Sequence, residues 1–254
     1  MVQAARQNAV LAYHEVMPDS NYAYCVTSKA FAEHLRLFGT AVKNNQQPPV
    51  EITFDDGEQS QLHNALPLLA EHSVSGRYFV TPGLIGTATK FLGWDELKTL
   101  QNAGHSIQSH GWSHKFLTFC SDSELAHELS ASKQLLEQKL GAAVEEISVP
   151  GGRWNRHVIE ACAAAGYKRV YVSDPWIATT MFGVDVIGRF MVRRTTTNAE
   201  LQKIVQRDRS ALWKMRMRSQ VRQRIVGLVG DGLYHRLWCR LTGYNEFEAA
   251  RQQR

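Results

Sequence analysis

The sequence lacks the features that mark exported, membrane-spanning and nucleotide-binding proteins. It contains no run of about 18 apolar residues, and its first residues, MVQAARQNAVLAYHEV, have neither the apolar stretch nor the small-residue cleavage site of a secretory signal. No Gly-rich dinucleotide fingerprint or Walker loop follows a predicted strand, and no internal repeat occurs. The sequence therefore predicts no leader, membrane span or nucleotide site.

Cysteine is scarce, with four residues in 254 and no CxxC pair. Cys25, Cys120, Cys162 and Cys239 are scattered along the chain without a partner pattern. This spacing favours buried thiols in a reducing compartment over a disulfide framework. We expect a cytoplasmic protein.

Basic charge is confined to one end of the chain. Residues 200–254 hold 12 Lys and Arg against 5 Asp and Glu, a net charge of +7, whereas residues 1–199 hold 17 against 19, a net charge of −2. Nucleic-acid binding needs clustered positive charge at the reading surface. The main body is therefore not expected to bind nucleic acid.

Short β-branched or aromatic runs alternate with stretches of helical periodicity through residues 1–198. We predict strands at 10–16, 51–54, 76–80, 105–110, 146–149, 168–172 and 186–192. We predict helices at 28–43, 59–72, 94–104, 121–140 and 155–165. This order is typical of a parallel sheet buried under helices, either open and doubly wound or closed into a barrel.

The strand at 51–54 runs directly into Asp55, Asp56 and Gly57. In a barrel of parallel strands, catalytic groups lie at the carboxyl ends of the strands. Adjacent side chains on an extended backbone point in different directions, so one carboxylate can bind a cation while the other reaches a water. The alternative is an Asp-Asp-Gly turn that caps the following helix.

A second polar cluster, SHGWSH, ends the strand at 105–110 and places His110 four residues before His114. If residues 111–114 form a helical turn, the two imidazoles share a face and have the spacing of a divalent-ion site. Two histidines and one carboxylate leave positions open for water and substrate, as a catalytic site requires. A coincidental or packing pair is the alternative.

Together the motifs TFDDG (53–57) and SHGWSH (109–114) resemble the first two motifs of the polysaccharide deacetylases, the NodB-homology or carbohydrate esterase family 4 group. The similarity covers about residues 10–195, including YHEV, RYFVTPGLIG and PGGRWNRHVIEACAAAGYKRV, and is typical of members found among exopolysaccharide-synthesis proteins. It implies a distorted (β/α)7 barrel that hydrolyses an N-acetyl, sometimes O-acetyl, group on an amino sugar.

Carried over to this sequence, the resemblance implies that Asp55 is the general base. Asp56, His110 and His114 are then the ligands of a divalent ion, usually zinc, with cobalt, nickel or manganese as alternatives. The backbone N–H of Gly151, after Pro150, is the implied oxyanion donor, although Pro150-Gly151-Gly152 also has the composition of a tight turn.

Two residues that the family pattern calls for are missing. Many members have an arginine two residues before the proline, where this chain has Ser148, and Arg153 or Arg156 is a possible replacement. The late histidine that protonates the departing amine is also absent, because after His157 only His235 remains. Three groups can stand in as the acid: His14, Arg189 as an electrostatic substitute, or a metal-bound water.

Asp174 and Trp176 follow the strand at 168–172 and fall near the family's fourth motif. The resemblance implies that they line the sugar pocket, where an aromatic ring stacks on a pyranose. The alternative is that Trp176 is a half-buried core residue beside a proline turn.

Residues 199–254 are predicted to form a basic amphipathic helical extension to the barrel of residues 1–198. One interpretation is a pair of helices packed on the barrel. The other is peripheral attachment to the anionic inner face of a membrane, through Trp213, Trp238 and the arginines.

Two functional classes remain open from sequence. In the first, the chain is a hydrolase acting on an N-acetylated glycan or glycolipid. In the second, it is a degenerate deacetylase that binds a glycan or partner without turnover. The intact metal-binding set favours catalysis.

Overall fold

The computed structural model describes residues 9–43 and 50–217. Contacts divide the chain into two compact units, Met1–Gln206 and Arg207–Arg254. In the second unit the described part includes a helical stretch at 209–217. Most of the predicted extension lies outside the described residues, so its boundary at 199 stays a prediction.

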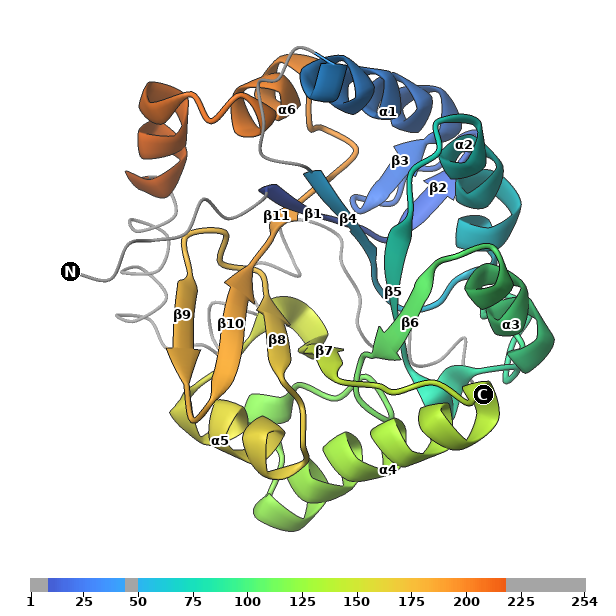
Figure 1. Cartoon of the computed structure of the whole chain (residues 1–254), viewed down its shortest axis with the longest axis vertical. Coiled ribbons are helices and arrows are strands. Elements are labelled where there is room, and N and C mark those ends of the chain that lie inside the picture. Colours follow the sequence, from blue (N-terminus) through green and yellow to red (C-terminus); the bar gives the residue numbers. More distant parts are fainter. Residues whose placement is uncertain (1–8, 44–49, 218–254) are drawn as a thin grey trace. The chain divides into compact units, whose positions relative to one another are not determined.

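A nine-stranded sheet forms the centre of the first unit, in the order β11-β1-β4-β5-β6-β7-β8-β10-β9 (Figure 1). All neighbouring pairs are parallel except β9 and β10. The strands are β1 (Ala9–Tyr13), β4 (Val50–Phe54), β5 (Gly76–Val80), β6 (Ser106–Ser109), β7 (Glu146–Ser148), β8 (Arg169–Val172), β9 (Ala178–Met181), β10 (Val184–Gly188) and β11 (Phe190–Met191).

The sheet closes on itself at Arg189. Strand β10 pairs with β8, and after Arg189 the next strand, β11, pairs with β1. The strand predicted at 186–192 is therefore interrupted at this residue, because its two halves bond to different neighbours. Counted as one, β10 and β11 complete a distorted (β/α)7 barrel, which confirms the fold expected from the resemblance.

Helices cover the outside of the ring of strands (Figure 1). They are α1 (Ser28–Lys43), α2 (Leu66–Glu71), α3 (Trp94–Asn102), α4 (Asp122–Leu140), α5 (Arg156–Ala164) and α6 (Asn198–Val205). The helix predicted at 121–140 is α4, which begins with a capping box formed by Ser121 and Glu124. A π-helical turn at Gln61–Ala65 precedes α2, within the helix predicted at 59–72.

Short strands β2 (Glu15–Met17) and β3 (Cys25–Thr27) form a separate two-stranded sheet. The strand predicted at 10–16 is therefore divided after Tyr13 between β1 and β2, and β3 was not predicted. The antiparallel strand β9 was also missed. These elements are only three or four residues long, which is too short for a period to be recognised in the sequence.

Alternate residues of each strand point into the barrel or out towards the helices. Inside, the rings of Phe79 and Tyr171 pack with centroids 4.9 Å apart. On the outer face, the rings of Phe54 and Tyr78 stack at 4.8 Å. Both faces of the sheet are therefore buried, as expected for parallel strands.

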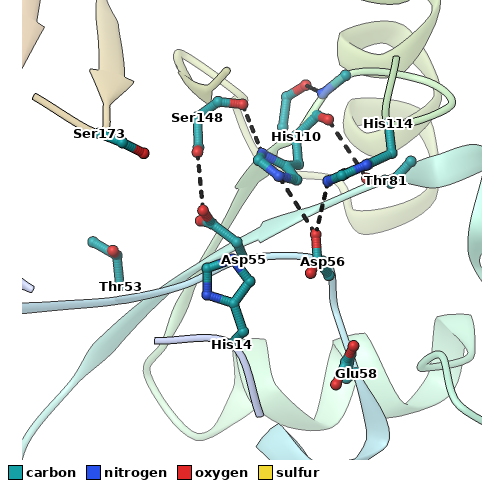
Figure 2. Close-up of polar contacts among 12 residues, drawn as sticks. His14, Thr53, Asp55, Asp56, Glu58, Thr81, His110, His114, Ser148 and Ser173 are labelled. Carbon is teal, nitrogen blue, oxygen red and sulfur yellow. Dashed lines mark hydrogen bonds and ion pairs between the residues drawn. The ribbon is translucent and has the colours of Figure 1, made fainter. Parts of the chain in front are cut away.

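Polar layers fill the two ends of the barrel. At the amino ends of the strands, Glu51 and Glu146 form ion pairs with Arg77, and Glu146 also pairs with Arg169. At the carboxyl ends lie Asp55, His110 and Ser148, together with His14 (Figure 2). The predicted catalytic motifs thus occupy the end of the barrel that the fold class makes available for chemistry.

The cysteines within the described residues are free thiols, of which Cys25 and Cys162 are buried and Cys120 is partly exposed. Cys239 lies outside the described residues. Among the helices of the described part of the chain, none combines the length and apolar character needed to cross a bilayer.

Candidate metal centre and active site

Side chains from the ends of two strands converge on one point at the top of the barrel. Asp56 follows β4, and His110 and His114 follow β6. Nε2 of His110 lies 3.5 Å, and Nε2 of His114 3.2 Å, from Oδ1 of Asp56 (Figure 2). One ligand atom from each residue lies within 4.8 Å of the other two. The three predicted ligands are therefore brought together.

These separations suit a small divalent ion. Metal–nitrogen and metal–oxygen bonds of about 2.0–2.2 Å in tetrahedral geometry place neighbouring ligand atoms about 3.3–3.5 Å apart. Oδ1 of Asp56 is also buried and has no well-directed hydrogen bond within the described structure. A buried carboxylate oxygen without a donor is costly unless a cation is bound. The donor set therefore fits a divalent metal.

The backbone that carries this set is irregular. Asp56 has φ = 75° and His114 has φ = 62°, both in the left-handed region, which non-glycine residues rarely adopt. The extended backbone expected at Asp56 is therefore wrong. The predicted divergence of the two carboxylates is nevertheless present, since Asp56 faces His110 and His114 whereas Asp55 faces Arg189. Residues 111–114 do not form the helical turn that was one way for His110 and His114 to share a face, since the segment is non-helical. Left-handed residues of this kind cluster at functional sites.

His110 is oriented by a second contact of its ring. Nδ1 lies 2.7 Å from the backbone oxygen of Ser148, which places a proton on Nδ1 and leaves the Nε2 lone pair facing Asp56. The pKa of His110 is lowered to about 4, chiefly by burial and also by nearby His114, against the opposing effect of Asp55 and Asp56. His110 is therefore neutral at physiological pH, as a metal ligand must be.

Arg189 holds the carboxylate of Asp55 in a bidentate ion pair. Nη1 and Nη2 each donate to one carboxylate oxygen at 2.7 Å. The same two nitrogens also donate to Oγ1 of Thr53, at 3.0 Å, and to Oγ of Ser148, at 2.7 Å. Arg189 is fully buried and Asp55 is 3% exposed. The pair is therefore shielded from water and rigidly oriented.

Both adjacent carboxyl groups are ionised. Burial by itself raises the pKa of Asp55, but Arg189 and then His110 outweigh it, so the pKa lies below its usual range. Burial likewise raises the pKa of Asp56, but His114, His14 and His110 together lower it by more than burial raises it, so this pKa also lies below its usual range. The strongest opposing partner thus differs between the two carboxylates, being Arg189 for Asp55 and His114 for Asp56.

The arginine that the family pattern places at position 148 is replaced from a different part of the chain. We expected Arg153 or Arg156 to replace it, but the guanidinium beside Asp55 belongs to Arg189. Arg153 instead lies over the ring of Phe116, at 4.7 Å, and Arg156 lies over that of Phe182. Since Arg189 is the residue at which the barrel closes, only the closed sheet brings it to Asp55.

His14 lies beside the carboxylate pair (Figure 2). In the register of β1 and β4, Tyr13 pairs with Phe54, so the following residues, His14 and Asp55, continue side by side at the carboxyl ends. Nδ1 of His14 is buried and has no hydrogen-bond partner within the described structure. Its ring packs against Tyr24 at 5.0 Å. An imidazole without a hydrogen-bond partner in the described structure therefore lies next to Asp55.

Pro150 and Gly151 lie in a turn directly after β7. Pro150 is buried against the loop of Gly111, whereas Gly151 is exposed and left-handed, with φ = 64°. A Cβ on Gly151 would lie 2.4 Å from Cε1 of Phe116, so no side chain fits there without a shift of that ring. The turn is thus close to the metal-binding loop, and the predicted role of its N–H stays a prediction.

Asp174 and Trp176 lie on the loop after β8, half-buried. Oδ1 of Asp174 accepts a hydrogen bond of 3.2 Å from the backbone N–H of Trp176. The indole packs edge-on against Phe190, at 5.6 Å, next to Arg189 in the chain. Both residues therefore flank the Arg189 side of the site, and their contact with a sugar stays a prediction.

Comparisons with known proteins agree with this geometry. The polysaccharide deacetylase family model matches residues 42–170. YxkH of Bacillus subtilis (strain 168), named as a polysaccharide deacetylase, is 26% identical over 199 residues, covering 72% of this chain and 70% of YxkH. The chitooligosaccharide deacetylase of Sinorhizobium fredii (strain NBRC 101917 / NGR234) is 30% identical over 131 residues, covering 50% of this chain and 59% of that protein.

Among solved structures, the Streptococcus pyogenes deacetylase PplD, in complex with acetate, has a similar fold. The TM-score is 0.68 at 22% identity, and the match covers 78% of this chain and 97% of that chain. The family match includes the two aspartates and two histidines of the site, but His14 precedes it and Arg189 follows it. Sequence comparison over 42–170 therefore finds the metal-binding set but not these two neighbours of Asp55.

Proposed function

The chain belongs to the polysaccharide deacetylase family, and on this premise we propose that it removes acetyl groups from N-acetylated sugars of a glycan or glycolipid by metal-dependent hydrolysis. The observation that carries the proposal is the convergence of Asp56, His110 and His114 beside the buried carboxylate of Asp55. The first three residues suit a divalent ion, and Asp55 suits proton transfer. Hydrolysis of an unactivated amide requires both.

Asp56, His110 and His114 would hold the ion. We propose zinc, with cobalt, nickel and manganese as alternatives, because two imidazoles and one carboxylate accept several divalent ions. When bound, the ion polarises the acetyl carbonyl and makes water easier to deprotonate. The left-handed backbone at Asp56 and His114 supports a functional role for this arrangement.

Asp55 is the proposed general base. It takes a proton from the attacking water while the new C–O bond forms at the acetyl carbon. Its charge and orientation are supported by the bidentate pair with Arg189, which keeps the carboxylate ionised. Oδ2 also accepts from Oγ of Ser148, at 3.3 Å, so Oδ1 is the oxygen with a lone pair left for the water. The N–H of Gly151 is the proposed donor to the developing oxyanion.

His14 is the proposed general acid. As the C–N bond breaks, an imidazolium at this position gives its proton to the departing amine, so that acetate and the free amino sugar leave. The proposal is supported by the position of His14 next to Asp55 and by its unpartnered Nδ1. Arg189, the electrostatic alternative, is occupied by Asp55, Thr53 and Ser148.

The substrate class is an N-acetylated amino sugar, alone or in a chain. This is supported by the family and by the name of the Sinorhizobium relative, which acts on chitooligosaccharides. Asp174 and Trp176 are the proposed contacts to the sugar, Trp176 through its ring face and Asp174 through a carboxylate oxygen. Pro150, in the turn after β7, is the third proposed contact to the substrate.

Acetate release tests the proposal directly. The purified protein is incubated with N-acetylglucosamine oligomers and added Zn²⁺ or Co²⁺, beside an Asp55→Asn variant and with metal analysis of both. We expect about one ion per chain in each protein and acetate release only from the unchanged one. Metal without release from any acetylated glycan would favour the non-catalytic binding module, and absence of a bound metal would exclude the hydrolase.

We also propose that residues 199–254 attach the protein peripherally to the inner face of a membrane. Support comes from the net charge of residues 200–254 and from Trp213, Lys214 and Arg216 in the helical stretch at 209–217. Trp238 lies outside the described residues. Flotation with anionic liposomes, compared with a chain ending at Thr197, tests the idea, and it fails if both forms stay in solution.

A further inference from the structure

The loop that carries His114 has no regular hydrogen-bond ladder of its own. Residues 110–114 follow β6 without forming a helix or strand, and Gly111 and His114 both have positive φ, at 76° and 62°. His110 is oriented through its own ring by the oxygen of Ser148. The conformation that directs His114 to the same point must therefore be imposed by contacts to the loop backbone.

One buried carboxylate supplies these contacts. Oε2 of Glu128 accepts hydrogen bonds from the backbone N–H groups of Trp112, at 2.8 Å, and Ser113, at 2.9 Å. Oε1 accepts the hydroxyl proton of Ser113 at 2.5 Å. Glu128 is on α4 and is only 3% exposed. Two consecutive amides directly before His114 are thus held by a group from outside the metal-binding motif.

Burial makes this interaction strong. A carboxylate removed from water is costly unless its oxygens accept well-directed hydrogen bonds. The three donors to Glu128 all belong to Trp112 and Ser113. If the loop moved, the carboxylate would lose its partners, so its burial on the rigid helix α4 resists any other loop conformation.

The opposite side of the loop is held by Gly83. Its N–H donates to the backbone oxygen of Trp112 at 2.9 Å, and a Cβ at this position would lie 2.6 Å from that oxygen. A second α4 side chain, Ser132, hydrogen-bonds Ser109 at 2.6 Å, and Ser109 accepts from the N–H of Gly111. The loop is therefore clamped between α4 and the turn after β5.

We propose that Glu128 is a positioning residue for the metal centre: by holding the amides of Trp112 and Ser113, it fixes His114 in its left-handed conformation and so determines the affinity for the divalent ion. The inference rests on the proposed function, since it concerns the ligands of the same ion. Glu128 touches neither ion nor substrate and acts only through the loop. Groups that orient metal ligands in this way typically change metal affinity by about 10–100-fold when removed.

Zinc affinity, measured by competition with a chelator, tests the role of Glu128. We expect Glu128→Ala to bind Zn²⁺ about 10–100-fold more weakly than the unchanged protein. Glu128→Asp keeps the charge but withdraws it by one methylene, and should give a smaller loss. Glu128→Gln keeps an oxygen that can accept both amides and should recover most of the affinity. Hydrogen exchange of the Trp112 and Ser113 amides in the metal-free protein should accelerate most in the Glu128→Ala variant and least in the Glu128→Gln variant.

Glu137→Ala is the matched control. Glu137 lies on the same helix and also accepts a backbone N–H, that of Val144 at 3.0 Å. It is about 13 Å further along the helix axis than Glu128, at 1.5 Å per residue. We expect unchanged zinc affinity. Equal weakening by Glu137→Ala would reveal general loosening and overturn the proposal.

The outcomes separate this inference from the proposed function. Equal zinc affinity of the unchanged protein and Glu128→Ala overturns only the positioning role. A protein that binds no divalent ion in its unchanged form overturns both. If Glu128→Ala does not fold, judged by circular dichroism, Glu128→Asp decides, because an affinity equal to that of the unchanged protein contradicts the proposal.

Discussion

The guanidinium of Arg189 binds both carboxylate oxygens of Asp55, although the two residues are 134 positions apart in the chain. Arg189 is the residue between β10 and β11, where the barrel closes, and Asp55 is the proposed base. Closure of the fold and orientation of the base thus depend on one buried side chain. A substitution at Arg189 is therefore expected to affect stability and activity together.

Replacing Arg189 by methionine should destabilise the protein by about 3–5 kcal/mol, because it leaves the buried charge of Asp55 without its partner. Urea unfolding of the metal-free protein measures the loss. The double variant Asp55→Asn with Arg189→Met removes both charges and should recover part of it. Equal stability of the single and double variants would show that the ion pair does not govern this position.

Asp55→Asn should lower the rate of acetate release by about 10²–10⁴-fold while zinc is retained, because the base is lost but the ligands are not. Steady-state kinetics and metal analysis on the same preparation check both statements. Loss of zinc in this variant would instead indicate that Asp55 belongs to the metal-binding set.

His14→Gln should slow release of an amine far more than release of a good leaving group. An amine needs a proton to depart, whereas 4-nitrophenolate does not. The variant should therefore lose about 10²–10⁴-fold in kcat on N-acetylglucosamine oligomers and much less on 4-nitrophenyl acetate. The exposed residue His63 provides a control, since His63→Gln should change neither rate. Equal losses on both substrates would argue against His14 as the acid.

His34 should make the protein less stable in acid. It is 1% exposed, lies 3.1 Å from the hydroxyl of Tyr13, and burial lowers its pKa to about 4 from 6.5. Between these values the unfolded chain binds more protons than the folded protein, so stability falls as the pH drops from 6.5 towards 4 and is unaffected above 6.5. At pH 4.5 the loss from this residue is about 2–3 kcal/mol.

His34→Gln removes this contribution. Denaturant unfolding at pH 7 and pH 4.5 should show a smaller acid-induced loss in the variant than in the unchanged protein. Part of the loss should persist in the variant, because the pKa of buried His110 is lowered in the same direction. If both proteins lose the same stability between the two pH values, protonation of His34 is not responsible.

Local sequence patterns were sufficient for most elements of the barrel. The helix at 28–43 matches α1, and the strand at 76–80 matches β5, because amphipathic period and β-branched runs are encoded over neighbouring residues. The metal-binding set was also predictable, since Asp56, His110 and His114 lie in two compact motifs. Their backbone conformations were not, because left-handed φ at non-glycine residues is decided by the contacts around them.

His14 could be found with one further step. It was already a candidate for the acid, and the alternation of β1 puts it on the same inner face as Val10 and Ala12. The register of β1 with β4 then places it beside Asp55. Strand register depends on how both strands pack, so the sequence suggested His14 as a candidate but not that it lies beside Asp55.

The sequence by itself determined most of the barrel strands, the helices that follow them and the two ligand motifs, because each depends on residues close together in the chain. Only the tertiary structure decided that Arg189 pairs with Asp55 and that Glu128 holds the loop before His114. Those contacts join segments that meet when the sheet closes and α4 packs against it. No local pattern records such a meeting, because its energy comes from burial and charge pairing in the completed barrel.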